Sequence, residues 1–461
     1  MSRVRRLSAG LQGRLRGEMG QALIRTFIAR AIAALGALAL ALVIGRLYGP
    51  AGVGVYALAQ GLLLGAGLLS RTGMDNALMR YVGQDHSSPF VLRYLRWAVT
   101  RCFIISLVAA AILWVGRPWF EALFDATGLA GVLTGIALAV PAYAFGFLLS
   151  GFFKGIRKPA TACLLENGSV ALVAGVLILV WEKTGNSAGL TIIGYAYAVA
   201  AWLVALQGGY QVWRWCRRQP WWSRRAEQAT SSEGAPVSLA QFTATSRAFF
   251  MTNLASFMQQ VLGVMVAGWL LSSTDLGLFK SSQQTATLIG FILIVINAIF
   301  PPRFASLYHQ GQIAALGRLA RQGALLGAVV AAPLLLLCLV FPGWVLSWFG
   351  DGFQNGAPLL RMIALAQLVN VSTGSVGFLL NMTGHERLMR NIALICNALG
   401  LLAFFVLIPP FGALGAALAL AFVLVVQNLV ALLFVWRRLG IWTLPGPNLL
   451  ALIGIKSSVV R

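Results

Sequence analysis

Residues 21–46 read QALIRTFIARAIAALGALALALVIGR, a run of apolar side chains interrupted by only a few polar ones. A helix of about 20 apolar residues is long enough to cross the hydrocarbon core of a bilayer. This run is too long for a signal peptide, and no small-residue cleavage site follows it. We therefore interpret it as a retained transmembrane helix.

Runs of the same kind recur along the whole chain. Of its 461 residues, 59% are hydrophobic and 10% are charged, whereas a soluble domain carries about 25% charged residues. The pattern predicts an all-α integral membrane protein of about twelve transmembrane helices. The twelve predicted runs are 21–46, 54–81, 89–116, 129–153, 160–181, 189–214, 240–271, 277–309, 313–341, 355–381, 387–408 and 413–437.

The basic residues are distributed unevenly between the loops. The net charge is +23, which in a soluble protein would indicate a nucleic-acid partner. Here the basic residues collect in every second loop, as the positive-inside rule requires. Examples are Arg93, Arg96, Arg437 and Arg438. We therefore expect no nucleic-acid partner, a multi-pass protein of the cytoplasmic (inner) membrane, and both termini in the cytoplasm.

The second half of the chain repeats the first. Gly54-Val55-Tyr56 opens the second run, and Gly277-Leu278-Phe279 opens the eighth. Two further matches follow at a similar offset, in the fourth and tenth runs and in the sixth and twelfth. Because each half holds an even number of spans, the halves would share one orientation and be related by a pseudo-two-fold axis along the membrane normal. The alternative is convergent packing of small residues between helices.

This repeat predicts two six-helix lobes. The most polar stretch of the chain lies between the halves and is typical of a flexible linker. The predicted parts are a basic cytoplasmic tail (1–20), an N-terminal lobe (21–214), a cytoplasmic linker (215–239), a C-terminal lobe (240–438) and a cytoplasmic tail (439–461).

No motif for a cofactor or a metal occurs in the sequence. The five cysteines are scattered without the spacing of metal ligands. There is no phosphate-binding loop of the form G-x-x-x-x-G-K-S/T. No predicted outer loop is long enough for a catalytic domain. We therefore expect no enzymatic activity, no cofactor and no metal site.

Charged residues inside the predicted spans are the main functional candidates, because a charge within a bilayer is costly. Arginine suits phosphate, to which it donates two parallel hydrogen bonds. Deep arginines without acidic partners would therefore line a cationic cavity for an anionic substrate. The substrate-binding candidates are Arg30, Arg247, Arg71, Arg25 and Arg361, and the coupling-ion candidates are Asp75 and Glu166.

Structural alternatives remain open for several of these residues. Arg25 and Arg361 lie close enough to span ends to reach the membrane interface. Arg71 and Asp75 are four residues apart and would neutralise each other on one helix face. Arg30 and Arg247 lie in the first helix of their repeats and are harder to assign to structure alone.

The turn after the first span resembles a known family. Residues 45–59, GRLYGPAGVGVYALA, contain a pattern R-x-x-G-P-x-x-x-G-x-Y that is similar to the start of polysaccharide-biosynthesis flippases. These are the O-antigen and exopolysaccharide members of the multidrug/oligosaccharidyl-lipid/polysaccharide exporter superfamily. Residues 71–81, RTGMDNALMRY, resemble the glycine-centred end of the family's second helix. The resemblance extends over approximately residues 20–440.

The resemblance implies two six-helix lobes around a central cavity and transport by alternating access. It also implies a polyprenyl-pyrophosphate-linked oligosaccharide as substrate, for surface polysaccharide synthesis. Expected partners are membrane lipids and the polysaccharide polymerase and glycosyltransferases of the same pathway. The alternatives are a cation-coupled drug or metabolite exporter of the superfamily and a membrane-embedded glycan polymerase or ligase.

Overall fold

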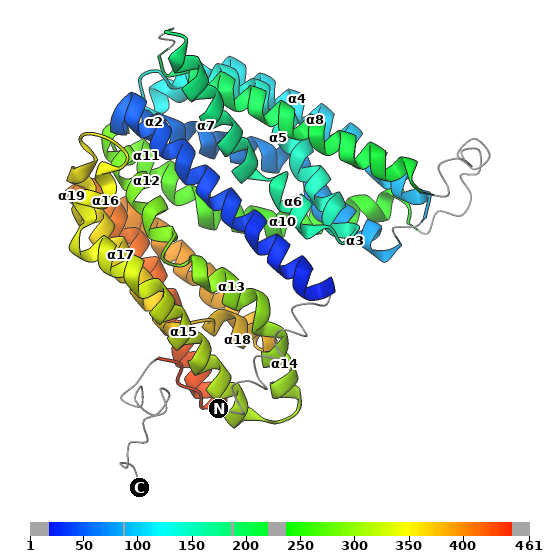
Figure 1. Cartoon of the computed structure of the whole chain (residues 1–461), viewed down its shortest axis with the longest axis vertical. Coiled ribbons are helices and arrows are strands. Elements are labelled where there is room, and N and C mark those ends of the chain that lie inside the picture. Colours follow the sequence, from blue (N-terminus) through cyan, green and yellow to red (C-terminus); the bar gives the residue numbers. More distant parts are fainter. Residues whose placement is uncertain (1–17, 86–87, 186–188, 220–236, 445–461) are drawn as a thin grey trace. The chain divides into compact units, whose positions relative to one another are not determined.

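The computed structural model describes residues 18–85, 88–185, 189–219 and 237–444. Within these ranges every regular element is a helix (Figure 1). The prediction of an all-α protein is therefore confirmed for the described part of the chain. Most of the predicted tails, 1–20 and 439–461, and of the linker 215–239 lies outside the described residues.

The chain folds into two compact units. The first comprises Met1–Tyr48 and Val55–Met265, and the second comprises Gly49–Gly54 and Val266–Arg461. The predicted division into lobes, linker and tails rests on the internal repeat and stays a prediction.

The first unit is built around one buried helix. Its elements are α2 (Glu18–Arg71, apart from Gly49–Gly54), α3 (Met74–Gln84), α4 (Phe90–Phe124), α5 (Leu129–Gly155), α6 (Pro159–Leu164), α7 (Asn167–Lys183), α8 (Thr191–Arg217), α10 (Leu239–Phe257) and the π-helix η1 (Met258–Leu262). Most residues of α5 are buried, and α5 packs against α3, α4 and α8. Glycines let α5 and α8 approach closely, since a Cβ on Gly135 would lie 2.1 Å from the Gly194 carbonyl carbon.

The second unit contains the remaining helices. These are most of α11 (Gly263–Leu270), then α12 (Ser273–Thr287), α13 (Phe291–Ile299), α14 (Pro301–His309), α15 (Ile313–Val340), α16 (Pro342–Ser347), the 3-10 helix η2 (Phe353–Gly356), α17 (Ala357–Thr373), α18 (Val376–Met382) and α19 (Glu386–Leu439). Its core joins α14, α15, α18 and α19 through buried side chains that include Phe304, Leu316, Leu380 and Leu432.

The long helices account for most of the predicted spans. Among the described residues, seven helices are long and apolar enough to cross a membrane. Two of the seven contain a break, at Gly49 (φ 67°) before Pro50 and at Gly412 (φ 55°) after Pro410. Glycine readily adopts this left-handed conformation, and proline removes a helical hydrogen bond. The helix α19 therefore covers two of the predicted runs, and α2 covers the first run and most of the second, which continues into α3.

Other predicted runs are not single helices. The run 160–181 divides into α6 and α7, 240–271 into α10, η1 and α11, and 277–309 into α12, α13 and α14. The run 355–381 is broken at Gly374, where φ is 69°. In contrast, α4 continues to Phe124, beyond the predicted end at residue 116. Hydropathy locates apolar segments but does not report where the backbone within them bends.

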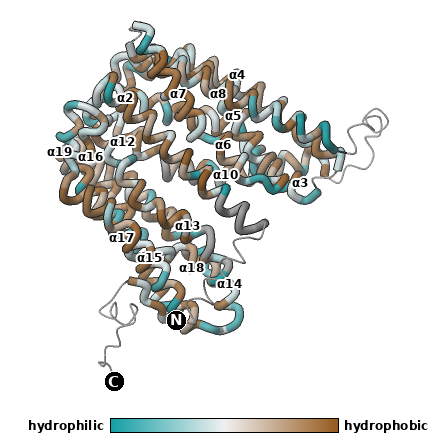
Figure 2. The backbone as a smooth tube through the Cα atoms, viewed as in Figure 1, coloured by the Kyte–Doolittle hydropathy of each residue, from teal (hydrophilic) through white to brown (hydrophobic). Residues whose placement is uncertain are grey.

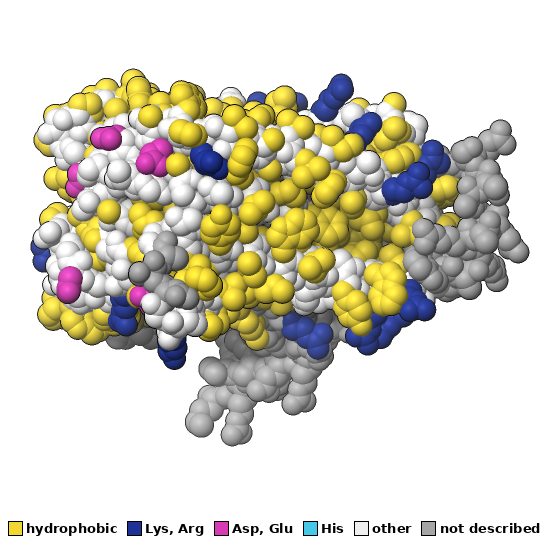
Figure 3. All heavy atoms as spheres, turned by 90° about the horizontal axis from the view of Figure 1, so that it is seen from above, with side chains coloured by type: hydrophobic (Ala, Val, Ile, Leu, Met, Phe, Trp, Pro, Cys, Tyr) yellow, Lys and Arg dark blue, Asp and Glu magenta, His cyan; other side chains and the backbone are white. Residues whose placement is uncertain are grey.

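The outer faces of the helices are apolar. On α4, Ile104, Val108, Ile112 and Val115 recur at helical spacing, and each is more than half exposed. Figure 2 shows the same hydrophobic character along most of α4. Hydrophobic side chains also cover much of the face shown in Figure 3. Exposed apolar stripes of this kind suit contact with lipid, and the chain is a multi-pass membrane protein.

Candidate functional site

The second predicted span is broken in the first unit, between α2 and α3. Thr72 (φ 44°) and Gly73 (φ 77°) both adopt a left-handed conformation there. The Ser246 hydroxyl of α10 donates a hydrogen bond of 2.6 Å to the Thr72 carbonyl. A Cβ on Gly73 would lie 2.2 Å from the Ser246 carbonyl oxygen. The break therefore depends on glycine both for its backbone conformation and for close contact with α10.

Arg71 and Asp75 lie on either side of this break and form an ion pair. Arg71 Nη1 donates to Asp75 Oδ2 at 3.1 Å, and Arg71 Nε donates to the Gly67 carbonyl at 3.0 Å. The guanidinium lies 4.3 Å from the centre of the Phe147 ring. Arg71 is 9% exposed and Asp75 is 8% exposed. The structure thus brings together two predicted site residues, in the arrangement that the neutralisation hypothesis describes.

One oxygen of this pair has no partner. Asp75 Oδ1 is buried and makes no hydrogen bond within the described part of the chain. A buried carboxylate oxygen without a donor carries a desolvation cost of about 1–3 kcal/mol. A proton or a small cation at this oxygen would remove that cost, so Asp75 stays a coupling-ion candidate.

A row of polar contacts continues between α3 and α10. Asn76 Nδ2 donates to Asn253 Oδ1 at 3.0 Å, and the hydroxyls of Tyr81 and Thr245 are 2.7 Å apart. Sequence reasoning did not select these residues, because they carry no charge. In the sequence, they could have been recognised from the recurrence of Asn and Thr within apolar runs, where such side chains commonly form hydrogen bonds between helices.

The second coupling-ion candidate, Glu166, is held at the start of α7. Its Oε1 accepts hydrogen bonds of 2.7 Å from Ser150 Oγ and of 2.7 Å from Lys154 Nζ. Both α5 residues lie just before the helix ends at Gly155. Because the carboxylate already has a cationic partner, an ion at Glu166 would have to displace or share Lys154.

The other candidate arginines do not take part in the ion pair of Arg71 and Asp75. Arg25 and Arg30 on α2 and Arg247 on α10 belong to the first unit, and all three are exposed. None of the three forms an ion pair or hydrogen bond with another described residue. Arg361 belongs to the second unit, where its Nε donates to the Leu339 carbonyl at 3.1 Å.

The second unit has an uncharged polar cluster around the break at Gly374. Ser375 Oγ donates to Asn297 Oδ1 at 2.5 Å, and Asn370 Nδ2 donates to Gln367 Oε1 at 2.9 Å. Thr443 Oγ1 donates to the Thr373 carbonyl at 2.8 Å. None of these residues was predicted as a site residue. In the sequence, this cluster could have been recognised only from its amide side chains, which lie within apolar runs.

No metal centre is found in the ranges that the structure describes. They contain no group of three or more His, Cys, Asp or Glu side chains that could hold a metal ion. All five cysteines lie in the described ranges and are buried, and none of them forms a disulfide.

Comparison with known proteins gives one family and several relatives. A family model described as polysaccharide biosynthesis protein matches residues 21–307. The lipid III flippase of Escherichia coli (strain K12) is 29% identical over 143 residues, which is 30% of this chain and 33% of that protein. The match therefore spans about a third of the length of that relative. A lipid III flippase of Shigella flexneri matches to the same extent.

Two solved structures share the fold. The inward closed conformation of the lipid II flippase MurJ superposes with a TM-score of 0.69, at 11% identity over 89% of this chain and 87% of that chain. The inward-facing conformation of a multidrug resistance MATE family transporter gives a TM-score of 0.65, at 14% identity over 91% of this chain and 98% of that chain. The predicted fold class, an all-helical two-lobed membrane protein, is confirmed by these similarities.

Proposed function

The chain belongs to the polysaccharide biosynthesis protein family, and from this premise we propose that it is a flippase for a polyprenyl-pyrophosphate-linked oligosaccharide. It would carry the headgroup from the inner to the outer leaflet of the cytoplasmic membrane by alternating access. The similarity to the lipid III flippases of Escherichia coli and Shigella flexneri supports this class of substrate. The product would serve surface polysaccharide synthesis.

Two unpaired arginines carry this proposal. Arg30 and Arg247 lie in the first helix of each repeat, are exposed, and have no acidic partner among the described residues. A bilayer-embedded guanidinium without a counter-ion is costly and is satisfied by an anionic ligand. The planar fork of arginine matches the oxygen atoms of a pyrophosphate. We assign both residues as pyrophosphate contacts, with Arg25 and Arg361 as further candidates.

Arg71 has a different role in this proposal. Asp75 already compensates its charge, so the pair has little attraction left for a substrate anion. Arg71 would act on the substrate only if Asp75 were protonated or bound another cation. The pair is therefore the candidate coupling element.

The membrane potential supplies enough free energy for the proposed transport. Moving one charge through 100 mV is worth about 2.3 kcal/mol, so a pyrophosphate of about −2 charge gains roughly 4–5 kcal/mol on leaving an inside-negative cell. A cation-coupled drug exporter, by contrast, would bind cationic compounds and would be expected to line its site with acids. The candidate site residues of this chain are mostly arginines.

Complementation of a flippase-deficient strain tests the site. Arg30→Ala and Arg247→Ala should each lose most export of surface polysaccharide while membrane abundance stays near normal. The corresponding lysine variants should retain partial function, because they keep the charge but lose the planar fork. Arg80→Ala, which removes an exposed arginine of α3, is the matched control. Full export by both alanine variants would exclude these two residues from the site.

Reconstitution tests the reaction itself. Purified protein in liposomes should move a labelled lipid-linked oligosaccharide between leaflets without ATP and without lengthening its sugar chain. Lengthening would identify a polymerase instead.

The proposed topology and partners can be tested separately. Both termini would lie in the cytoplasm, with the pathway's polymerase and glycosyltransferases as neighbours. In a cysteine-free background, Asp351→Cys should react with an impermeant thiol reagent added to intact cells, and Ser231→Cys should not. The reverse result would overturn the proposed orientation.

A further inference from the structure

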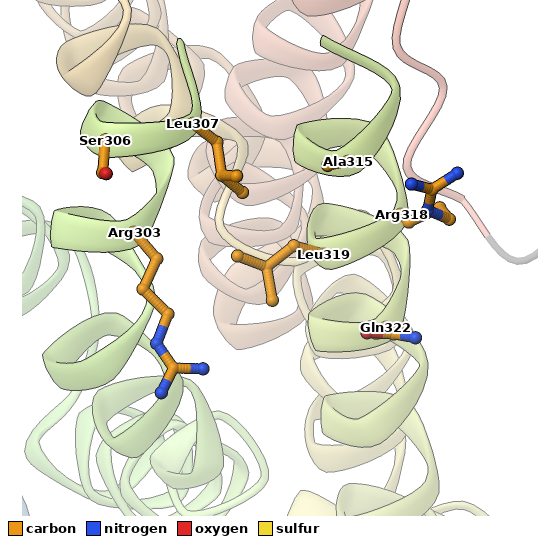
Figure 4. Close-up of a pocket in the computed structure, with 7 residues that line it drawn as sticks. All are labelled: Arg303, Ser306, Leu307, Ala315, Arg318, Leu319 and Gln322. Atoms are coloured by element: carbon orange, nitrogen blue, oxygen red, sulfur yellow. The ribbon is translucent and has the colours of Figure 1, made fainter. Parts of the chain in front are cut away.

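A pocket lies between α14 and α15, and none of its lining residues belongs to the proposed substrate site. Its volume is about 410 Å³, and it is lined by Arg303, Ser306, Leu307, Ala315, Arg318, Leu319 and Gln322. Figure 4 shows Leu307 of α14 and Leu319 of α15 between the two helices. Arg303 extends beside α14, whereas Arg318 and Gln322 extend from the side of α15 that faces away from it. The pocket therefore has an apolar floor flanked by basic and polar groups.

The charge of this region is not compensated. The chain has no acidic residue between Asp275 and Asp351. Arg303 and Arg318 are exposed, and neither forms an ion pair within the described residues. Arg321 adds a third exposed arginine one turn beyond Arg318. The pocket is thus complementary in charge to an anion.

Its position along α15 places the pocket at the membrane interface. Residues 323–340 carry no charged side chain, and at about 1.5 Å per residue they extend roughly 27 Å. This length is close to the ~30 Å thickness of the hydrocarbon core. Trp344 and Trp348 follow this segment at its other end and are exposed, as expected of side chains at the opposite interface. Arg318 and Gln322 therefore lie at the level of the lipid headgroups.

The shape and surroundings of the pocket favour a lipid over a free anion. The two guanidinium groups lie on different sides of the leucine floor and do not converge on one small ion. Only 33% of the apolar stretch of α15 is buried within the protein, so much of this helix faces lipid. An amphiphile would cover the leucines with its glycerol and upper acyl carbons and place its anionic headgroup near the arginines on either side. Basic pockets between helices on the cytoplasmic side of a membrane bind lipid headgroups in this way.

We propose that the α14–α15 pocket binds an anionic glycerophospholipid of the surrounding bilayer, with Arg303 and Arg318 attracting its headgroup from the two sides of the leucines. On the predicted topology this lipid belongs to the cytoplasmic leaflet. The site does not depend on the proposed transport substrate.

Lipid binding to the purified full-length protein in neutral detergent tests this assignment. Retention of phosphatidylglycerol against phosphatidylcholine is measured by native mass spectrometry and by lipid titration. The double variant R303A/R318A should bind phosphatidylglycerol about 30-fold more weakly, the factor that about 1 kcal/mol for each of two arginines gives. R437A/R438A removes the same charge from exposed arginines of the same unit that do not line the pocket, and should bind as the wild type does.

Two further variants separate lipid binding from folding. Ala315→Phe fills the pocket but keeps both arginines, and should also lose the lipid. R303K/R318K keeps the charge and should bind nearly as well as the wild type. Unchanged binding in R303A/R318A, or equal loss in R437A/R438A, would overturn the proposal. So would displacement of the lipid by millimolar inorganic phosphate, or clear preference for a polyprenyl pyrophosphate, since either would identify a different ligand.

Discussion

The second and eighth predicted spans, which correspond in the predicted repeat, are both interrupted, but the two interruptions differ in backbone conformation. Between α2 and α3, Thr72 and Gly73 are both left-handed, and the helix ends abruptly. Between α12 and α13, Gly290 keeps φ at −78°, and successive i to i+3 hydrogen bonds carry the chain from Leu288 to Phe291. The first is a sharp break that requires glycine, whereas the second is a tightened turn that other residues could form.

The polar groups beside the two interruptions also differ. Asp75 and Asn297 are 222 positions apart (297 − 75), close to the 223 positions that separate Gly54 from Gly277 in the predicted repeat (277 − 54). Asp75 pairs with Arg71 across the break in its own helix, whereas Asn297 accepts a hydrogen bond from Ser375 of α18. A buried charge needs a counter-charge, and an amide needs only a hydrogen-bond donor. The first unit therefore holds its second helix with an ion pair, and the second unit uses a neutral bridge.

Removal of one partner of the Arg71–Asp75 ion pair should cause the largest loss of unfolding free energy. Asp75→Ala leaves Arg71 buried without its counter-charge, which typically costs about 3–5 kcal/mol. Thermal and denaturant unfolding in detergent would measure this loss. The double variant R71M/D75A removes both charges and should recover much of the lost stability. A double variant less stable than Asp75→Ala alone would show that the pair is not the relevant interaction.

Substitution of the two glycines should separate the sharp break from the tightened turn. Gly73→Ala places a Cβ 2.2 Å from the Ser246 carbonyl oxygen at φ 77°, and should cost about 2–4 kcal/mol from backbone strain and overpacking. Gly290→Ala meets its nearest neighbour, Gln367 Oε1, at 3.2 Å with an ordinary φ. Its effect should stay within about 1 kcal/mol. Equal losses of unfolding free energy in the two variants would show that the sharp break and the tightened turn do not differ in their need for glycine.

The neutral bridge should contribute less than the ion pair. Asn297→Ala and Ser375→Ala should each reduce stability by about 1 kcal/mol, the typical net value of a hydrogen bond. A double-mutant cycle isolates their interaction from other effects of each change. Strict additivity of the two losses would mean that the contact is not energetically coupled.

The smallest effect is expected from Asp75→Asn on transport. If the membrane potential acts mainly on the charge of the substrate, this variant should reduce export per folded molecule only modestly. Collapse of the voltage should slow export by the wild type and the variant alike. Abolished export at normal abundance would instead identify Asp75 as the site of an obligatory coupling ion.

Hydropathy alone located the long apolar segments, because such a segment is most stable within a bilayer whatever its neighbours. The twelve predicted runs lie mainly on helices of the described structure, but five of them (54–81, 160–181, 240–271, 277–309 and 355–381) are divided between shorter elements. The spacing of Arg71 and Asp75 also predicted that they would meet, since residues four apart share one face of a helix. The first inference concerns the composition of single segments, and the second concerns two residues four positions apart. Neither requires knowledge of how distant segments pack.

The contacts that join distant segments required the tertiary structure. Tyr81 meets Thr245 across 164 positions, and Ser375 meets Asn297 across 78. The α14–α15 pocket lies between two consecutive helices, and its existence depends on how these helices pack side by side. Hydropathy reports how much a segment prefers lipid, but it contains no information about which uncharged polar side chains face one another. The class of the protein was therefore determined by the sequence itself, whereas the polar contacts and the pocket were decided by packing.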